Sequence, residues 1–235
     1  MCVVWQIHRV EHVDSTNTAL KRMALEGAPA GTVLIARRQS GGRGRMGRHF
    51  YSPEGGLYMS ILLRQEDPTR LTIAAATAAA EAAEQLCGRP VGIKWVNDLY
   101  LDGHKVCGIL AERITGIDDC VVVGFGVNIA EPAGGFPPEA GPAGALLSTA
   151  LPDAAERLAA DILERFCCYA QSAPAAYMPG YRARSILDGK TVEWKQGDTP
   201  CQGTVLGIAD NGGLRVLTAE GERVLSSGEV TLHQE

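Results

Sequence analysis

The dipeptide Asp102-Gly103 constrains the fold more than any other part of this sequence. It separates two alternating apolar runs, and Asp-Gly in that position is a strong signal for a two-residue type I′ turn of a β-hairpin. A regular register from this turn places Tyr100 opposite Lys105 and Asp98 opposite Cys107. Because successive side chains of a strand point to opposite faces, we expect these four side chains on one face of the hairpin. A carboxylate and an ammonium would therefore project into one region.

The neighbours of this face decide between a structural and a functional interpretation. An exposed salt bridge between Asp98 and Lys105 would be common and of little consequence. The segment Lys94-Trp-Val-Asn97, however, adds a second cation, an aromatic ring and an amide directly before the hairpin. Gly108 lies inside a strand, where a missing side chain often marks the close approach of a ligand. Together these residues favour a binding site.

A loop rich in arginine and glycine at residues 41–48 is a second candidate site. Guanidinium groups bind phosphate oxygens in a bidentate manner, and the free N–H groups of glycine-rich turns form anion-binding concavities. We expect the loop to be mobile until a ligand orders it, because it has like charges and few apolar anchors. A solvated basic loop and a nucleic-acid contact are the alternatives. The net charge of −5 and the lack of another dense basic cluster argue against nucleic acid. The loop cations are Arg43, Arg45 and Arg48.

Short motifs occur along the chain in an order that resembles the biotin protein ligase family. The resemblance spans most of residues 10–130, with one departure, because the family usually has proline where Val96 stands. Valine changes the local rigidity but removes no functional group. The motifs are Ser15-Thr16-Asn17, Gln39, Gly42-Arg-Gly-Arg45, Lys94-Trp-Val-Asn-Asp98, Lys105-Val-Cys-Gly-Ile-Leu110 and Gly126-Val-Asn128.

The resemblance implies a reaction in two steps. Biotin and ATP first give biotinyl-5′-AMP and pyrophosphate, and a lysine of a biotin carboxyl carrier domain then accepts the biotin. Negative charge spreads in the first step, so cations are the main catalytic resource, and Mg²⁺ would be held by phosphate oxygens and water rather than by dedicated side chains. In the second step Asp98 would orient and deprotonate the lysine amine, with Asn97 assisting. The catalytic cations would be Lys105, Arg45, Arg48 and Lys94.

Binding roles follow from the same resemblance. Hydroxyl and amide side chains suit the ureido ring of biotin, which offers both donors and acceptors. Asn128 would contact the adenine, although a turn residue after a buried strand is the alternative explanation. The residues implied for biotin and its adenylate are Ser15, Thr16, Asn17, Gln39, Arg43, Gly44, Arg45, Lys105 and Gly108, and those implied for the nucleotide are Arg45, Arg48, Lys94, Asn97 and Asn128.

Composition limits the class of protein. A chain of 235 residues with 46% hydrophobic residues can bury a large core, and no segment reaches the apolar length of a membrane span. The apolar run at the N-terminus is too short for a secretory signal, so we expect a cytoplasmic protein. Seven cysteines without a Cys-x-x-Cys pair indicate free thiols rather than a disulfide framework or a zinc site.

The hydrophobic periodicity predicts an α+β fold. We expect a mixed β-sheet packed with helices over residues 1–187, which the resemblance makes a class II synthetase-like catalytic domain. Short strands between glycine turns then predict a small β-barrel over residues 188–235, SH3-like by resemblance, which would cover the site, receive the acceptor or act only structurally. The predicted strands are 3–13, 32–37, 57–64, 93–95, the 99–113 hairpin, 120–128, 191–194, 203–208, 214–218 and 222–226; the predicted helices are 16–27, 71–87 and 152–172; and 130–144 is a candidate lid over a nucleotide.

Other functions stay open at this point. A lipoate ligase or an octanoyl transferase would share the fold. Cys107, on the predicted active face, is a candidate nucleophile for such a transferase. A non-catalytic module that binds biotin or an adenylate is the alternative from another class. The Ser-Thr-Asn motif begins at residue 15, which leaves no room for the winged helix of repressor-type ligases, so we expect no operator binding. A homodimer through a sheet edge is also open.

Overall fold

A seven-stranded mixed sheet forms the centre of the computed structural model, which describes residues 4–64, 67–226 and 228–232. The strand order is β1-β2-β3-β7-β6-β5-β4, with β1 and β2 parallel and every other pair antiparallel. The strands are β1 (Gln6–Val13), β2 (Thr32–Gln39), β3 (Leu57–Arg64), β4 (Gly92–Lys94), β5 (Asp98–Leu101), β6 (His104–Arg113) and β7 (Cys120–Val127). Of the predicted strand 3–13, residue 3 lies outside the described residues.

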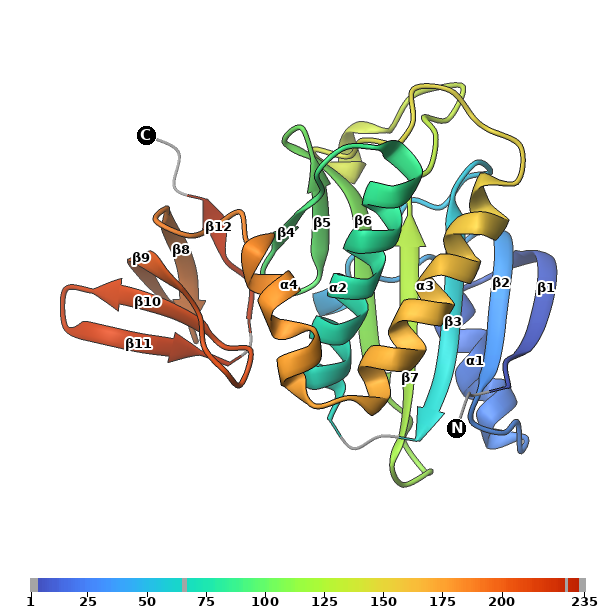
Figure 1. Cartoon of the computed structure of the whole chain (residues 1–235), viewed down its shortest axis with the longest axis horizontal. Coiled ribbons are helices and arrows are strands. Elements are labelled where there is room, and N and C mark those ends of the chain that lie inside the picture. Colours follow the sequence, from blue (N-terminus) through green and yellow to red (C-terminus); the bar gives the residue numbers. More distant parts are fainter. Residues whose placement is uncertain (1–3, 65–66, 227, 233–235) are drawn as a thin grey trace.

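Helices cover both faces of this sheet (Figure 1). On one face lie α2 (Pro68–Cys87) and α3 (Ala154–Gln171), and α1 (Thr16–Leu25) packs on the other. The alanine-rich face of α2 has little side-chain bulk, so the helix packs closely on the sheet and is buried along most of its length. The carboxylate of Asp67 caps its first turn, and Gly88 ends it in the left-handed conformation.

The predicted hairpin forms, but its register shifts. Asp102 and Gly103 both have positive φ, as a type I′ turn requires, and Tyr100 lies opposite Lys105. A β-bulge then inserts one extra residue into β6, so Asp98 pairs with Gly108 rather than with Cys107. The prediction that Cys107 shares the face of Asp98 is therefore wrong. Cys107 instead pairs with the buried Leu99 and lies in the main hydrophobic core.

A five-stranded antiparallel sheet follows, in the order β11-β10-β9-β8-β12. The indole N–H of Trp95 donates to the carbonyl of Gly212 at 2.9 Å, and Arg182 Nε donates to the carbonyl of Ile208 at 3.0 Å, so this sheet is tied to the segment between β4 and β5 and to the helix that carries Arg182. The predicted α+β class is confirmed. Its elements are β8 (Thr191–Gln196), β9 (Thr199–Ile208), β10 (Leu214–Thr218), β11 (Gly221–Leu225) and β12 (Thr231–Leu232), preceded by α4 (Met178–Ala183). No helix in the described part of the chain is long and apolar enough to cross a membrane.

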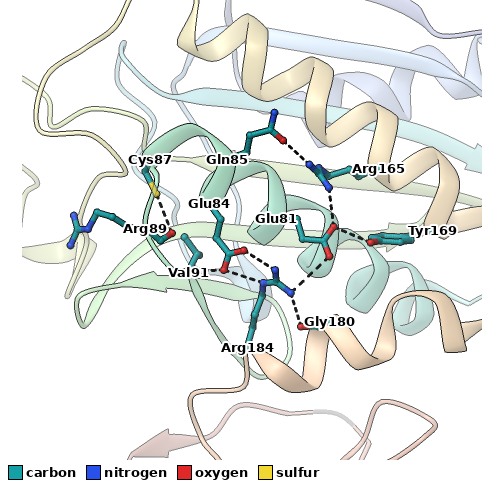
Figure 2. Close-up of polar contacts among 10 residues, drawn as sticks. All are labelled: Glu81, Glu84, Gln85, Cys87, Arg89, Val91, Arg165, Tyr169, Gly180 and Arg184. Carbon is teal, nitrogen blue, oxygen red and sulfur yellow. Dashed lines mark hydrogen bonds and ion pairs between the residues drawn. The ribbon is translucent and has the colours of Figure 1, made fainter.

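A polar network joins α2, α3 and α4 (Figure 2). Arg184 Nη2 lies 2.7 Å from Glu84 Oε2, and its Nη1 lies 3.8 Å from Glu81 Oε1. From α3, Arg165 and Tyr169 both reach Glu81, at 3.3 and 2.9 Å. One carboxylate pair on α2 thus holds both neighbouring helices.

The same network supports β4 at the edge of the sheet. Ile93 N–H donates to the carbonyl of Arg184 at 2.7 Å, and Ile186 N–H donates back to the carbonyl of Ile93 at 3.1 Å. Val91 N–H donates to Glu84 Oε1 at 3.1 Å. Segment 184–186 therefore covers the outer edge of β4 and fixes the strand that ends at Lys94.

Candidate functional site

One cavity of about 580 Å³ contains every site residue that the sequence predicts. Its walls come from the start of α1, the loop after β2, the strands β4 to β7 and the loop that follows β7. The predicted residues on its wall are Ser15, Thr16, Asn17, Gln39, Arg43, Gly44, Arg45, Arg48, Lys94, Asn97, Asp98, Lys105, Gly108 and Asn128. The structure thus brings together motifs that lie more than a hundred residues apart in the sequence.

Hydroxyl and amide groups gather where α1 begins. Ser15 caps the helix, and Thr16 donates to Gln39 Oε1 through its backbone N–H at 2.8 Å and its hydroxyl at 3.1 Å. The hydroxyl of Ser60 lies 2.8 Å from Thr16 Oγ1 and 2.7 Å from Asn17 Oδ1. These buried polar groups have fixed orientations, because each one is hydrogen-bonded. This end of the cavity can bind a small, uncharged molecule that carries donors and acceptors.

Opposite charges meet on the face of the hairpin. Lys105 Nζ lies 2.7 Å from Asp98 Oδ2, and Asn97 Nδ2 donates to Asp98 Oδ1 at 3.0 Å and to the carbonyl of Ile109 at 2.9 Å. Both carboxylate oxygens of Asp98 therefore have a partner. A Cβ at Gly108 would lie 3.2 Å from the ring of Phe50 and 3.4 Å from Lys105 Cε, so the glycine lets both side chains lie close to the backbone of β6.

The loop arginines face the second sheet. Arg45 donates to Asn97 Oδ1 at 3.1 Å and to the carbonyl of Gly228 at 2.9 Å, whereas Arg48 pairs with both carboxylate oxygens of Glu229. Within the loop, Gly44 N–H donates to the carbonyl of Arg48 at 2.8 Å. Two guanidinium groups are therefore held beside the charged face of the hairpin. The ordering of this loop by a ligand stays a prediction.

Lys94 lies partly buried in this cationic end. Burial lowers its pKa, and the nearby charges of Lys105 and Arg48 lower it further, while Asp98 and Glu229 oppose the shift. A bound anion would reverse this balance, because it would favour the charged ammonium. The cluster of Lys94, Lys105 and the loop arginines is suited to phosphate oxygens.

Asn128 lines the cavity beside the loop that follows β7. Its side chain is buried, and Nδ2 donates to the carbonyl of Gly144 at 3.0 Å. The loop is tied to β6 as well, because Lys105 N–H donates to the carbonyl of Pro142 and Gly144 N–H donates to the carbonyl of Lys105. The predicted lid, residues 130–144, therefore borders the cavity and is hydrogen-bonded to Lys105, a candidate catalytic residue.

Three residues of the sequence motifs, Cys107, Trp95 and Val96, are buried and help to form the core. Cys107 is fully buried, and burial raises the pKa of its thiol, so it is a poor nucleophile for a ligand in the cavity. This correction removes the sequence-based support for a transferase that uses Cys107. Trp95 is a cavity wall and also part of the core. Val96 is buried, and its carbonyl accepts a hydrogen bond from the Tyr181 hydroxyl at 3.0 Å.

Sequence reasoning missed several cavity residues. A Cβ at Gly126 would lie 2.6 Å from the ring of Phe50, and one at Gly124 would lie 2.1 Å from Asn17 Oδ1. Glycines inside a strand signal such close approaches, so Gly124 and Gly126 could have pointed to this wall. Phe136 and Glu139 also line the cavity and lie in the predicted lid segment 130–144, although neither was named as a site residue. Glu229 and Thr231 were missed as well, and the sequence holds no local signal for them.

Comparison with known proteins identifies the family. The model described as the biotin/lipoate A/B protein ligase family matches residues 10–128, and the biotin protein ligase C terminal domain matches residues 189–232. The chain is 32% identical to a biotin–acetyl-CoA-carboxylase ligase of Paracoccus denitrificans, over 92% of this chain and 96% of that one. The chain belongs to the biotin protein ligase family.

Further relatives agree with this assignment. A biotin–acetyl-CoA-carboxylase ligase of Mycobacterium tuberculosis is 33% identical over 97% of this chain and 89% of its own length. Among solved structures, the biotin protein ligase from Aquifex aeolicus in complex with biotin and ATP superimposes with a TM-score of 0.84 at 29% identity, covering 98% of this chain and 99% of that chain. The similarity therefore extends over nearly all of this sequence, and the fold is that of the family.

Proposed function

We propose that this member of the family joins biotin to ATP and then transfers the biotin to a lysine of a biotin carboxyl carrier domain. The observation that carries the proposal is the division of one cavity into two ends. Hydroxyl and amide groups gather at the start of α1, and four cations lie at the hairpin and the loop. The relative from Aquifex aeolicus binds biotin and ATP, the two ligands that such a cavity would need.

The cationic end would catalyse adenylation. A carboxylate oxygen of biotin attacks the α-phosphorus of ATP, a new C–O–P linkage forms, and pyrophosphate leaves with the electron pair of the broken P–O bond. Lys105 would contact the carboxylate and the α-phosphate, while Arg45, Arg48 and Lys94 would bind the other phosphate oxygens. Cations that are already in place stabilise charge in the transition state without a cost of reorganisation.

The hydrogen-bonding end would bind biotin. Thr16 and Gln39 already share a hydrogen bond and would face the ureido ring together with Ser15 and Asn17. Arg43 would contact the ring system of biotin and its adenylate. Gly44 and Gly108 have no side chain, so the ligand could lie close to the backbone at both positions.

Asp98 would serve the transfer step. The incoming lysine amine must lose a proton, because an unperturbed lysine has a pKa of about 10.4. Asp98 can accept that proton and orient the amine, with Asn97 holding the carboxylate at 3.0 Å. The amine then attacks the carbonyl carbon of biotinyl-5′-AMP, an amide bond forms, and AMP leaves.

The nucleotide would lie between the loop arginines and Asn128, with Asn97 also in reach. Asn128 would contact the adenine through the atoms of its amide that Gly144 leaves free. Mg²⁺ would be held by phosphate oxygens and water, because Asp98 and Glu229 already pair with cations. No group of three or more His, Cys, Asp or Glu residues in the described ranges could hold a metal ion.

We propose a division of the chain into a catalytic domain, 1–187, and a C-terminal domain, 188–235.

Transfer to an acceptor tests this proposal as a whole. A purified biotin carboxyl carrier domain is incubated with the chain, biotin, ATP and Mg²⁺, and intact-mass spectrometry follows the modification. We expect one biotin per carrier domain, with none when ATP is omitted or when the acceptor lysine is replaced by arginine. Lipoate in place of biotin serves as the competing substrate, and modification by lipoate alone would support a lipoate ligase instead.

A further inference from the structure

Glu112 lies directly behind the hydrogen-bonding end of the cavity. It belongs to β6, and its side chain is only 19% exposed. Glu112 does not line the cavity, yet it contacts two residues that do, Asn17 and Arg43. Any effect of Glu112 on a ligand would therefore act through these two side chains.

The carboxylate of Glu112 fixes the orientation of the Asn17 amide. Asn17 Nδ2 donates to Glu112 Oε2 at 2.9 Å and to the carbonyl of Leu110 at 3.1 Å. Asn17 Oδ1 lies 2.7 Å from the hydroxyl of Ser60. Because a carboxylate and a carbonyl only accept hydrogen bonds, the NH₂ group must face them and the amide oxygen must face the serine.

Glu112 also holds the first arginine of the loop. Arg43 Nη2 lies 3.4 Å from Glu112 Oε1, and Lys21 Nζ lies 2.9 Å from the same oxygen. Arg45 and Arg48 point instead toward residues 228 and 229. The loop arginines therefore divide, and only Arg43 is drawn toward the biotin end of the cavity.

Glu112 keeps its charge at working pH. Burial alone would raise its pKa, but the hydrogen bonds from Asn17 and Lys21 and the charges of Lys21 and Arg43 outweigh burial and lower it. A neutral amide at this position has no charge to attract Arg43, and its NH₂ group could not accept from Asn17 Nδ2, so both contacts would weaken.

We propose that Glu112 is a positioning residue for biotin, which sets the amide orientation of Asn17 and draws Arg43 over the biotin end of the cavity. This inference rests on the proposed function. It assigns Glu112 to substrate affinity, whereas the cations at the other end of the cavity act on the phosphates.

Steady-state kinetics of Glu112→Gln tests the inference, with KM for biotin and KM for ATP measured separately in an ATP–pyrophosphate exchange assay. We expect KM for biotin to rise at least tenfold, while KM for ATP stays within about twofold and kcat within about threefold. Equal increases in both KM values, a loss confined to kcat, or an unchanged KM for biotin would each overturn the inference.

The matched control is Lys21→Gln, which removes a partner of Glu112 that does not line the cavity. It should leave KM for biotin within about twofold of the wild-type value. A rise equal to that of Glu112→Gln would show that packing around α1 explains the effect.

If Glu112→Gln does not fold, Glu112→Asp is the second variant, because it keeps the charge but withdraws the carboxylate by one methylene. A KM for biotin that rises less than threefold in the aspartate variant would then overturn the inference. A wild-type chain without biotin-dependent exchange would refute the proposed function before any variant is compared.

Discussion

The two side chains of the Asp98–Lys105 ion pair would each serve one of the two proposed steps. The ammonium would serve adenylation and the carboxylate would serve transfer, and the 2.7 Å contact between Lys105 Nζ and Asp98 Oδ2 holds both side chains in place. The two steps should therefore respond differently to substitution at each position.

Substitution of Asp98 by asparagine should separate the steps. Asp98→Asn keeps the shape but cannot accept a proton, so the rate of biotin transfer should fall by about 10²- to 10⁴-fold, the usual contribution of a general base. Adenylation should fall far less. Single-turnover transfer from preformed biotinyl-5′-AMP measures the first effect, and pyrophosphate exchange measures the second. Parallel losses in both assays would show that Asp98 only supports Lys105.

Lys94 predicts a pH dependence. Its lowered pKa means that the ammonium loses its proton at a lower pH than an ordinary lysine does. If the charged form binds phosphate, pyrophosphate exchange should decline as the pH rises through that lowered value, below about 10.4. Lys94→Arg stays charged throughout this range, so its alkaline limb should move to higher pH. An alkaline limb that does not move would assign the titration to another group.

The sequence was sufficient to predict the polar and charged residues that meet in one cavity, because their side-chain chemistry and motif order carry the information. It failed at Cys107, because a β-bulge of one residue leaves no signal in an alternating apolar run. It also missed Glu112, which acts from behind the wall and differs in no local pattern from an exposed glutamate at a strand end.

Secondary-structure elements were likewise predicted where the local sequence pattern was clear and missed where it was not. The strand Leu57–Arg64 and β10 were predicted with the bounds that the structure has, since both are apolar runs between clear turns. The helix Met178–Ala183 and the strand Thr231–Leu232 were not predicted, because elements so short have no measurable period. Their positions depend on tertiary contacts, such as the hydrogen bond from the Tyr181 hydroxyl to the carbonyl of Val96 and the pairing of β12 with β8.

The Glu84–Arg184 pair should stabilise the arrangement of these elements. Glu84→Gln removes the charge that Arg184 and Val91 N–H bind, and we expect a loss of about 1–3 kcal/mol in the free energy of unfolding by urea. Glu222→Gln is the control, because its pair with Arg215 is exposed and should not contribute measurably. A similar loss in both variants would contradict a special role for the network.

The effect of Glu84 should depend on pH in a defined direction. Burial raises its pKa, but hydrogen bonds from Arg184 and Val91 N–H and the charge of Arg184 outweigh burial, so the folded pKa is lowered. The stabilisation is then complete above the ordinary glutamate pKa of about 4.3 and is lost as the pH falls through the lowered value. The difference between wild type and Glu84→Gln should shrink in acid, and a constant difference would contradict this assignment.

At the scale of the whole molecule, the second sheet completes the cavity. Glu229 and Thr231 line it, and the contacts of Arg45 and Arg48 with residues 228 and 229 connect the phosphate end to the C-terminal part of the chain. The sequence predicted two structural units, with a cover over the site as one possible role of the second, but it did not indicate which residues of that unit would line the cavity. The absence of operator binding stays a prediction, which a sequence-specific gel shift would contradict. A homodimer stays an open alternative, which sedimentation tests.

Pyrophosphate exchange is the most direct test of the central claim, that the cavity activates biotin with ATP. The purified chain is incubated with ATP, Mg²⁺ and labelled pyrophosphate, and parallel reactions contain no acid, biotin, lipoate or octanoate. We predict exchange of label into ATP with biotin alone, and its loss when Lys105 is replaced by methionine. Exchange that depends on lipoate instead, or no exchange with any acid, would contradict the account.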